Sequence, residues 1–168
     1  ITYFLFENSL ETSSFKSNSL YITTESEDSA LFMEWNNSEF GEAGNQLILP
    51  LFEGTKKAPN NALSGLSRSQ RSLVREAIAS DDFEGKKGQR MAVWTPGCRV
   101  LLVGMGKKDE FGHRKARNTG ARVIAALSKK NGLGLTVRFT SGWSSERMLD
   151  FAEGMMLRDY EFLEHQGV

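Results

Sequence analysis

A short apolar run that enters a glycine turn is the feature that most limits what this chain can fold into. Residues 100–103 read Val-Leu-Leu-Val and lead into Gly-Met-Gly at residues 104–106; a helical pattern begins after the charged residues 107–110. A continuous apolar run bounded by glycines is typical of a strand that is buried on both faces. Glycine lets the backbone turn where a side chain would clash. The stretch therefore predicts a strand, turn and helix unit of an α/β domain.

Strand and helix patterns alternate from residue 47 onward. Strands are predicted at 47–52, 89–94, 98–103 and 133–139, and helices at 62–79, 114–131 and 144–157. This alternation predicts an α/β fold of three layers, a mixed, mainly parallel sheet with helices on both faces. Earlier in the chain, residues 1–6 and 20–24 predict short strands, and residues 30–35 fit either a strand or a helix.

Apolar side chains at three- and four-residue steps predict which face of each helix is buried. In the first helix, over 62–79, the predicted inward side chains are Leu63, Leu66, Leu73, Val74, Ala77 and Ile78.

The composition excludes several classes of protein. At 168 residues the chain fits one domain with a real core. Its 21 basic and 21 acidic residues balance, so no general field attracts nucleic acid or an anionic membrane. No apolar run reaches the roughly 20 residues that span a bilayer. A single cysteine, Cys98, excludes an internal disulfide framework and fits a reducing compartment, which predicts a cytoplasmic location.

The glycine turn is the first candidate for a binding site. Backbone N–H groups of Gly104, Met105 and Gly106, together with Lys107, are placed to bind a phosphate where a strand leads into a helix. The spacing matches neither the P-loop nor the dinucleotide-binding fingerprint, and the acidic residues 109–110 would repel phosphate. A structural turn is therefore favoured, and a nucleotide or ADP-ribose-type binding module is the alternative.

No metal site or catalytic group is predicted. His113, His165 and Cys98 lack the spacing of metal ligands. The carboxylates Asp81 and Asp82, with Glu84, lie among basic residues and favour a solvated turn over a cation site. A Gly-x-Ser-x-Gly motif is absent, and residues 140–143 (Thr-Ser-Gly-Trp) predict a loop.

Basic side chains along the middle of the chain are the best candidates for contacts with nucleic acid. Acidic residues lie between them and the net charge is zero, so a strong electrostatic footprint is not expected. Nucleic acid stays an alternative partner. The basic residues are Lys86, Lys87, Arg90, Lys107, Lys108, Arg114, Lys115 and Arg117.

Four segments carry a resemblance to a known family: LILPLFEG at 47–54, DFEGKKGQ at 82–89, RVLLVGMGKKDEF at 99–111 and FAEGMMLRDYEF at 151–162. In this order and spacing they resemble the N-terminal domain of the leucyl (cytosol) aminopeptidases. The likeness covers roughly residues 47–162. It implies a macro-domain-like sheet for 47–162 and the start of an interdomain linker at 163–168. Residues 1–46 lie outside the likeness and are expected to be N-terminal strands and loops of the same domain.

The resemblance also implies a function for a longer parent protein. Such a parent removes N-terminal amino acids, leucine among them, from peptides, using two zinc or manganese ions held by a C-terminal catalytic domain. Residues 118–120 (Asn-Thr-Gly) are the nearest match to that domain's Asn-Thr-Asp-Ala-Glu-Gly-Arg signature and lack both carboxylates. The chain is thus expected to be inactive alone, with an architectural or regulatory role. Its implied partners are its own catalytic domain, a homo-hexamer and the parent's peptide substrates.

Overall fold

The computed structural model describes residues 19–24, 32–35, 46–58, 60–127, 133–140 and 142–166. Six strands, three α-helices and two short 3-10 helices occupy these ranges. In chain order they are β1 (Ser19–Thr24), β2 (Phe32–Trp35), β3 (Gln46–Leu51), η1 (Asn60–Leu63), α1 (Arg68–Ala79), β4 (Arg90–Thr95), β5 (Cys98–Gly104), η2 (Lys108–Glu110), α2 (His113–Ala125), β6 (Leu133–Arg138) and α3 (Ser145–Gln166).

The described strands form one mixed sheet in the order β2-β1-β6-β3-β5-β4. β3 is parallel to both β5 and β6. The pairs β1–β2, β1–β6 and β4–β5 are antiparallel, so the expectation of a mainly parallel sheet is wrong. The tight turn between Thr95 and Cys98 makes β4 and β5 a hairpin, and a hairpin pairs antiparallel. The parallel part is confined to the centre.

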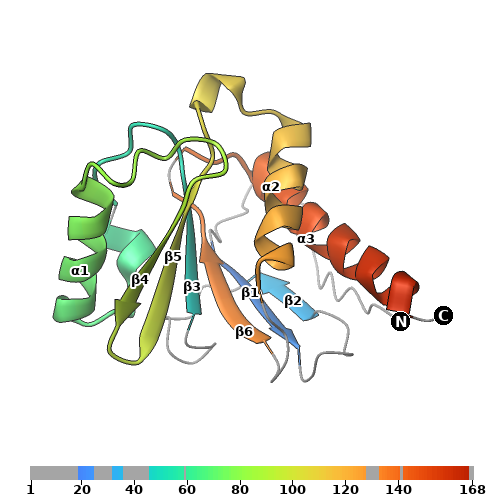
Figure 1. Cartoon of the computed structure of the whole chain (residues 1–168), viewed down its shortest axis with the longest axis horizontal. Helices are drawn as coiled ribbons and strands as arrows, with labels where there is room; N and C mark the ends of the chain where they lie inside the picture. The colour runs from blue at the N-terminus through green and yellow to red at the C-terminus, as the bar shows by residue number, and fades with distance from the viewer. Residues whose placement is uncertain are drawn as a thin grey trace.

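Helices lie on both sides of this sheet. Figure 1 shows α1 on one side and α2 and α3 on the other. Side chains of β3 alternate between the two faces: Leu47, Leu49 and Leu51 pack with α1, whereas Ile48 packs with α2 and α3. This alternation follows from the two-residue period of a strand. The central strands are therefore apolar on both faces, as the run at residues 100–103 predicts.

The predicted helix over 62–79 is two separate elements. η1 ends at Leu63, Gly65 adopts a left-handed φ of 81°, and α1 begins after Ser67. Ser67 and Gln70 form a capping box: Gln70 N donates to Ser67 Oγ at 3.2 Å, and Ser67 N donates to Gln70 Oε1 at 2.7 Å. These two bonds satisfy free backbone donors and fix the start of the helix. Leu73 is 40% exposed, so its predicted inward position is also wrong.

The other two helices differ from prediction at their C-terminal ends. α2 ends at Ala125 instead of residue 131, soon after its last buried positions, Val123 and Ile124. The Asn-Gly pair at 131–132, a dipeptide suited to ending a helix, lies outside the described residues. α3 continues to Gln166 instead of ending near residue 157. Its start is as predicted, with Arg147 N donating to Ser144 Oγ at 3.3 Å.

The N-terminal part contributes two strands to the same sheet. β1 confirms the predicted strand at 20–24, and β2 shows that residues 32–35 are a strand. The predicted strand at 1–6 lies outside the described residues. Within the described ranges, no helix is both long and apolar enough to cross a bilayer.

Candidate functional site

The Gly104–Lys107 turn lies where β5 ends, against the end of β3 and the loop at residues 85–89. Gly104 N donates to Gln89 O at 2.7 Å, Met105 N to Leu51 O at 2.9 Å, and Gly106 N to Gly85 O at 2.9 Å. All three N–H groups proposed for a phosphate are thus already bonded to protein carbonyls. A buried or bonded donor is not available to a ligand without losing its partner. The geometry favours the structural turn.

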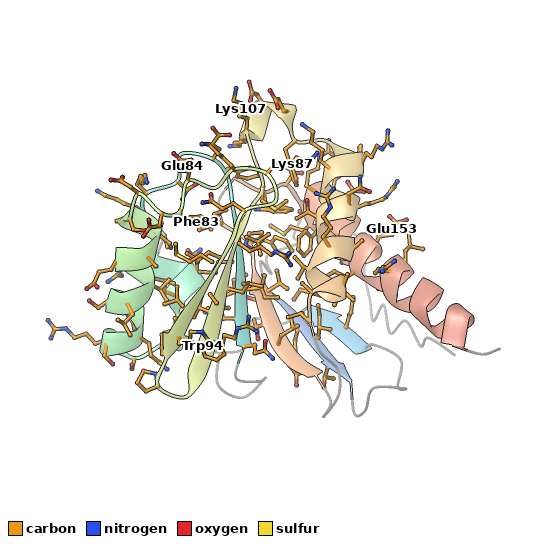
Figure 2. All side chains as sticks on the ribbon, in the orientation of Figure 1. Phe83, Glu84, Lys87, Trp94, Lys107 and Glu153 are labelled. Atoms are coloured by element: carbon orange, nitrogen blue, oxygen red, sulfur yellow. The ribbon has the colours of Figure 1, made fainter. Side chains whose placement is uncertain are left out.

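Tight backbone packing explains why this turn contains glycine. A Cβ on Gly104 would lie 2.1 Å from the carbonyl oxygen of Lys86. Gly106 has a φ of 76°, which disfavours other residues. Met105 is 3% exposed and packs into the core on the α2 side. Lys107 alone among the four predicted residues is exposed, and Figure 2 shows it at the tip of the molecule with Glu84 and Lys87.

The loop at residues 81–89 contains the carboxylates considered as a cation site. The side chain of Gln89, which was not among the candidate residues, fixes the conformation of this loop. Gln89 Oε1 accepts from the N–H groups of Glu84 and Gly85, both at 3.0 Å, and Gln89 Nε2 donates to Asp82 O at 2.7 Å. Lys86 forms an exposed ion pair with Glu84, and this contact lowers the pKa of the Glu84 carboxyl. The carboxylates therefore belong to a solvated, self-neutralising turn.

Aromatic rings fill the region where an α/β sheet commonly binds ligands, beyond the carboxyl ends of its parallel strands. Phe52 follows β3 and Trp143 lies between β6 and α3; each is 7% exposed and their ring centroids are 5.6 Å apart. Phe111 packs on both, at 5.1 and 4.9 Å. Trp143 Nε1 also donates to Pro50 O at 3.3 Å. Trp143 is thus anchored in the core rather than open to a ligand.

The predicted histidine and cysteine candidates lie apart. His113 opens α2, and its Nδ1 is 2.5 Å from Asp150 Oδ2 on α3, a partner that sequence spacing could not identify. Cys98 is 6% exposed at the start of β5, and burial raises the pKa of its thiol. The side chain of His165 is not described. Across the described ranges, no three His, Cys, Asp or Glu side chains gather as a metal-binding group.

The predicted basic candidates do not form one uninterrupted patch. On and before α2, Lys115 pairs with Glu110 at 3.5 Å and Arg117 with Glu153 at 3.2 Å. Glu84 pairs with Lys86 at the tip of the molecule. Binding of nucleic acid stays a prediction. The Asn-Thr-Gly match at 118–120 lies inside α2, where Gly120 packs against α3.

The sequence profile described as the cytosol aminopeptidase family, N-terminal domain, matches residues 48–166. The chain belongs to this family. The match ends with α3 and begins within β3, so it takes in both helical layers and the parallel centre of the sheet.

Curated relatives named probable cytosol aminopeptidase agree with this assignment. The protein from Rippkaea orientalis is 29% identical over 133 residues, which are 75% of this chain and 25% of that protein. The protein from a Cyanothece species is 26% identical over 129 residues, 71% of this chain and 26% of that protein. The chain thus spans about a quarter of the length of these relatives.

A solved structure shows the same fold. A mutant of tomato leucine aminopeptidase superimposes with a TM-score of 0.54 at 22% identity, covering 74% of this chain and 27% of that one. These comparisons favour the aminopeptidase interpretation over a separate nucleotide-binding module.

Proposed function

We propose that this chain is the non-catalytic N-terminal domain of a longer, metal-dependent leucyl aminopeptidase that removes N-terminal amino acids from peptides. The observation that carries the proposal is the match of residues 48–166 to the N-terminal domain of the cytosol aminopeptidase family. The two divalent metal ions, zinc or manganese, would be held by the parent's catalytic domain. No described group of this chain fits them, so no catalytic step is assigned to its residues.

The role proposed for the domain is architectural or regulatory. The N–H groups of its glycine turn are hydrogen-bonded to carbonyls of the same chain. Aromatic rings fill the region beyond the carboxyl ends of its parallel strands. Both features suit a rigid body that supports a neighbouring domain. The partners in this proposal are the catalytic domain of the same protein, further copies in a homo-hexamer and the parent's peptide substrates, in the cytoplasm.

The finer description of the fold is part of the same proposal. A sheet with α1 on one side and α2 and α3 on the other supports a three-layer, macro-domain-like arrangement. Residues 1–46 are assigned to the same domain because β1 pairs with β6. The linker proposed to start at residue 163 would start within α3, because this helix continues to Gln166.

The test compares this chain with the full coding sequence from which it comes. Both proteins are assayed for hydrolysis of leucine p-nitroanilide with Mn²⁺ or Zn²⁺ added. We expect the longer protein to turn over the substrate and this chain to be inactive with either metal. Hydrolysis by this chain alone would refute the non-catalytic role. A coding sequence that stops at Val168 would refute the aminopeptidase parent.

A further inference from the structure

A pocket of about 430 Å³ opens between the outer strands of the sheet and α2. Its lining includes Arg90 of β4, Val103 and Gly104 of β5, and Thr119, Arg122 and Val123 of α2. Ligand sites for small molecules commonly have volumes of roughly 300–1,000 Å³. The pocket is separate from the region at the strand ends that Phe52, Phe111 and Trp143 fill.

The fold leaves this side of β4 uncovered. β4 is one of the two edge strands of the described sheet, and its side chains alternate, so that Arg90, Ala92 and Trp94 are exposed. Trp94 is 73% exposed, with the guanidinium carbon of Arg99 5.0 Å from its ring centroid. Figure 2 shows Trp94 at the end of β4 farthest from Lys107. The helices on this face therefore pack over the inner strands and leave a hollow beside β4.

The two charged side chains that line the pocket are both cationic. Within the described residues, the side chains of Arg90 and Arg122 have no hydrogen-bond or ion-pair partner, and no carboxylate lines the pocket. Two other cations on α2 do have acidic partners: Lys115 pairs with Glu110 at 3.5 Å and Arg117 with Glu153 at 3.2 Å. Arg122 lies in the last turn of α2, where a cation is favoured by the helix dipole. That preference does not account for Arg90, which comes from a strand.

Apolar side chains also line the pocket. Val103 is 3% exposed and Val123 is 1% exposed, and both line the pocket. Thr119 Oγ1 donates its proton to the carbonyl of Lys115, so the hydroxyl offers the pocket no further donor. A guanidinium group binds a carboxylate through two parallel N–H donors. The pocket thus combines two cationic sites on separate elements with an apolar floor.

We propose that this pocket binds a small aliphatic dicarboxylate. One carboxylate pairs with the guanidinium of Arg122 and the other with that of Arg90, while the hydrocarbon between them covers the exposed side chains of Ala125 and Ala126, which also line the pocket. A compact dianion such as phosphate satisfies the charges but leaves the apolar side chains of Ala125 and Ala126 exposed to water. Binding at this pocket does not depend on the aminopeptidase proposal, since it uses residues of this chain alone.

The experiment is a titration of the purified chain with sodium succinate, followed by isothermal calorimetry and ¹⁵N chemical shifts at constant ionic strength. We expect saturable binding of one succinate, with shifts confined to α2 and to the β4–β5 hairpin. R90Q and R122Q should each weaken binding about tenfold or more, because each removes a charge-assisted hydrogen-bonded pair. Both side chains are exposed, so the variants should fold as the unsubstituted chain does.

R68Q is the matched control, since it removes the same charge from α1 on the opposite side of the sheet. It should leave succinate binding unchanged. Equal weakening by R68Q would show general charge attraction and overturn the site. Tighter binding of inorganic phosphate than of succinate would overturn the dicarboxylate class, and an absence of saturable binding by either anion would overturn the proposal entirely.

Discussion

At the scale of single residues, Asp150 does more than its position in the sequence suggests. The residue is 7% exposed on α3. Its Oδ2 lies 2.5 Å from His113 Nδ1 and 3.3 Å from Arg147 Nη1, and its Oδ1 lies 3.7 Å from Arg117 Nη2. His113 and Arg117 belong to α2, so one carboxylate joins the N-terminal parts of two helices.

Replacing this carboxylate should destabilise the fold far more than replacing an exposed one. Asp150→Asn keeps the shape but removes the charge from a site surrounded by three basic groups, and we expect a loss of about 2 kcal/mol of unfolding free energy. Glu153→Gln removes an acid that pairs with Arg117 but is half exposed. Its cost should stay within about 0.5 kcal/mol. Urea unfolding measures both, and equal costs would contradict the role given to Asp150.

At the scale of elements, two glycines allow α2 and α3 to pack closely against each other. A Cβ on Gly120 would lie 2.1 Å from the carbonyl oxygen of Phe151, and one on Gly154 would lie 1.9 Å from that of Arg117. Each glycine therefore faces the backbone of the opposite helix. The two helices approach more closely than any side chain at these positions would allow.

Gly120→Ala should lower stability although alanine is the better helix former. Alanine gains roughly 1 kcal/mol over glycine in a helix interior. Overpacking against a backbone that cannot give way costs about 1–3 kcal/mol, and this cost should outweigh the gain in helix propensity. Asn118→Ala on the exposed side of α2 is the control and should stabilise by up to about 0.7 kcal/mol. A thermal melt in which both variants gain stability would contradict the close packing.

The sequence predicted local elements better than it predicted how they meet. β5 follows from the apolar run at 100–103, and the β4–β5 hairpin follows from the Thr-Pro-Gly turn at 95–97. Both depend on residues that are close together in the sequence. The capping box of Ser67 and Gln70 can also be recognised from the sequence pattern, and it predicts the observed start of α1. The close contact of Gly120 with the backbone of Phe151 joins residues 31 positions apart, and local sequence does not predict it.

Long-range contacts also explain what the sequence missed at the candidate site. The phosphate-binding interpretation of residues 104–107 depended on free N–H groups. Their acceptors are the carbonyls of Leu51, Gly85 and Gln89, which lie on other elements. The pocket beside β4 likewise brings Arg90 together with Arg122 from two elements, so no motif spacing signals it.

At the scale of the whole molecule, the N-terminal strands complete one side of the core. Leu20 and Ile22 of β1 are fully buried in the cluster that also contains Val137 of β6 and the buried faces of α2 and α3. β1 pairs with β6 along six residue positions, from Ser19 with Arg138 to Thr24 with Leu133. Yet the family match begins only at residue 48, which leaves both strands outside it.

A chain that starts at Gln46 should therefore be less stable than the whole chain and prone to associate. Removing β1 and β2 leaves β6 as an unpaired edge, and an exposed apolar edge strand pairs readily with another chain. It also removes the side chains that covered Leu135 and Val137. Light scattering after gel filtration should show oligomers of the shortened chain, and its thermal midpoint should fall. In the whole chain, Ile22→Asp should act in the same direction, because it places an unpaired charge in the core. The opposite outcome is a shortened chain that stays monomeric and has the thermal midpoint of the whole chain. That result would show that the domain is complete from β3 onward and that the N-terminal strands do not contribute to its stability.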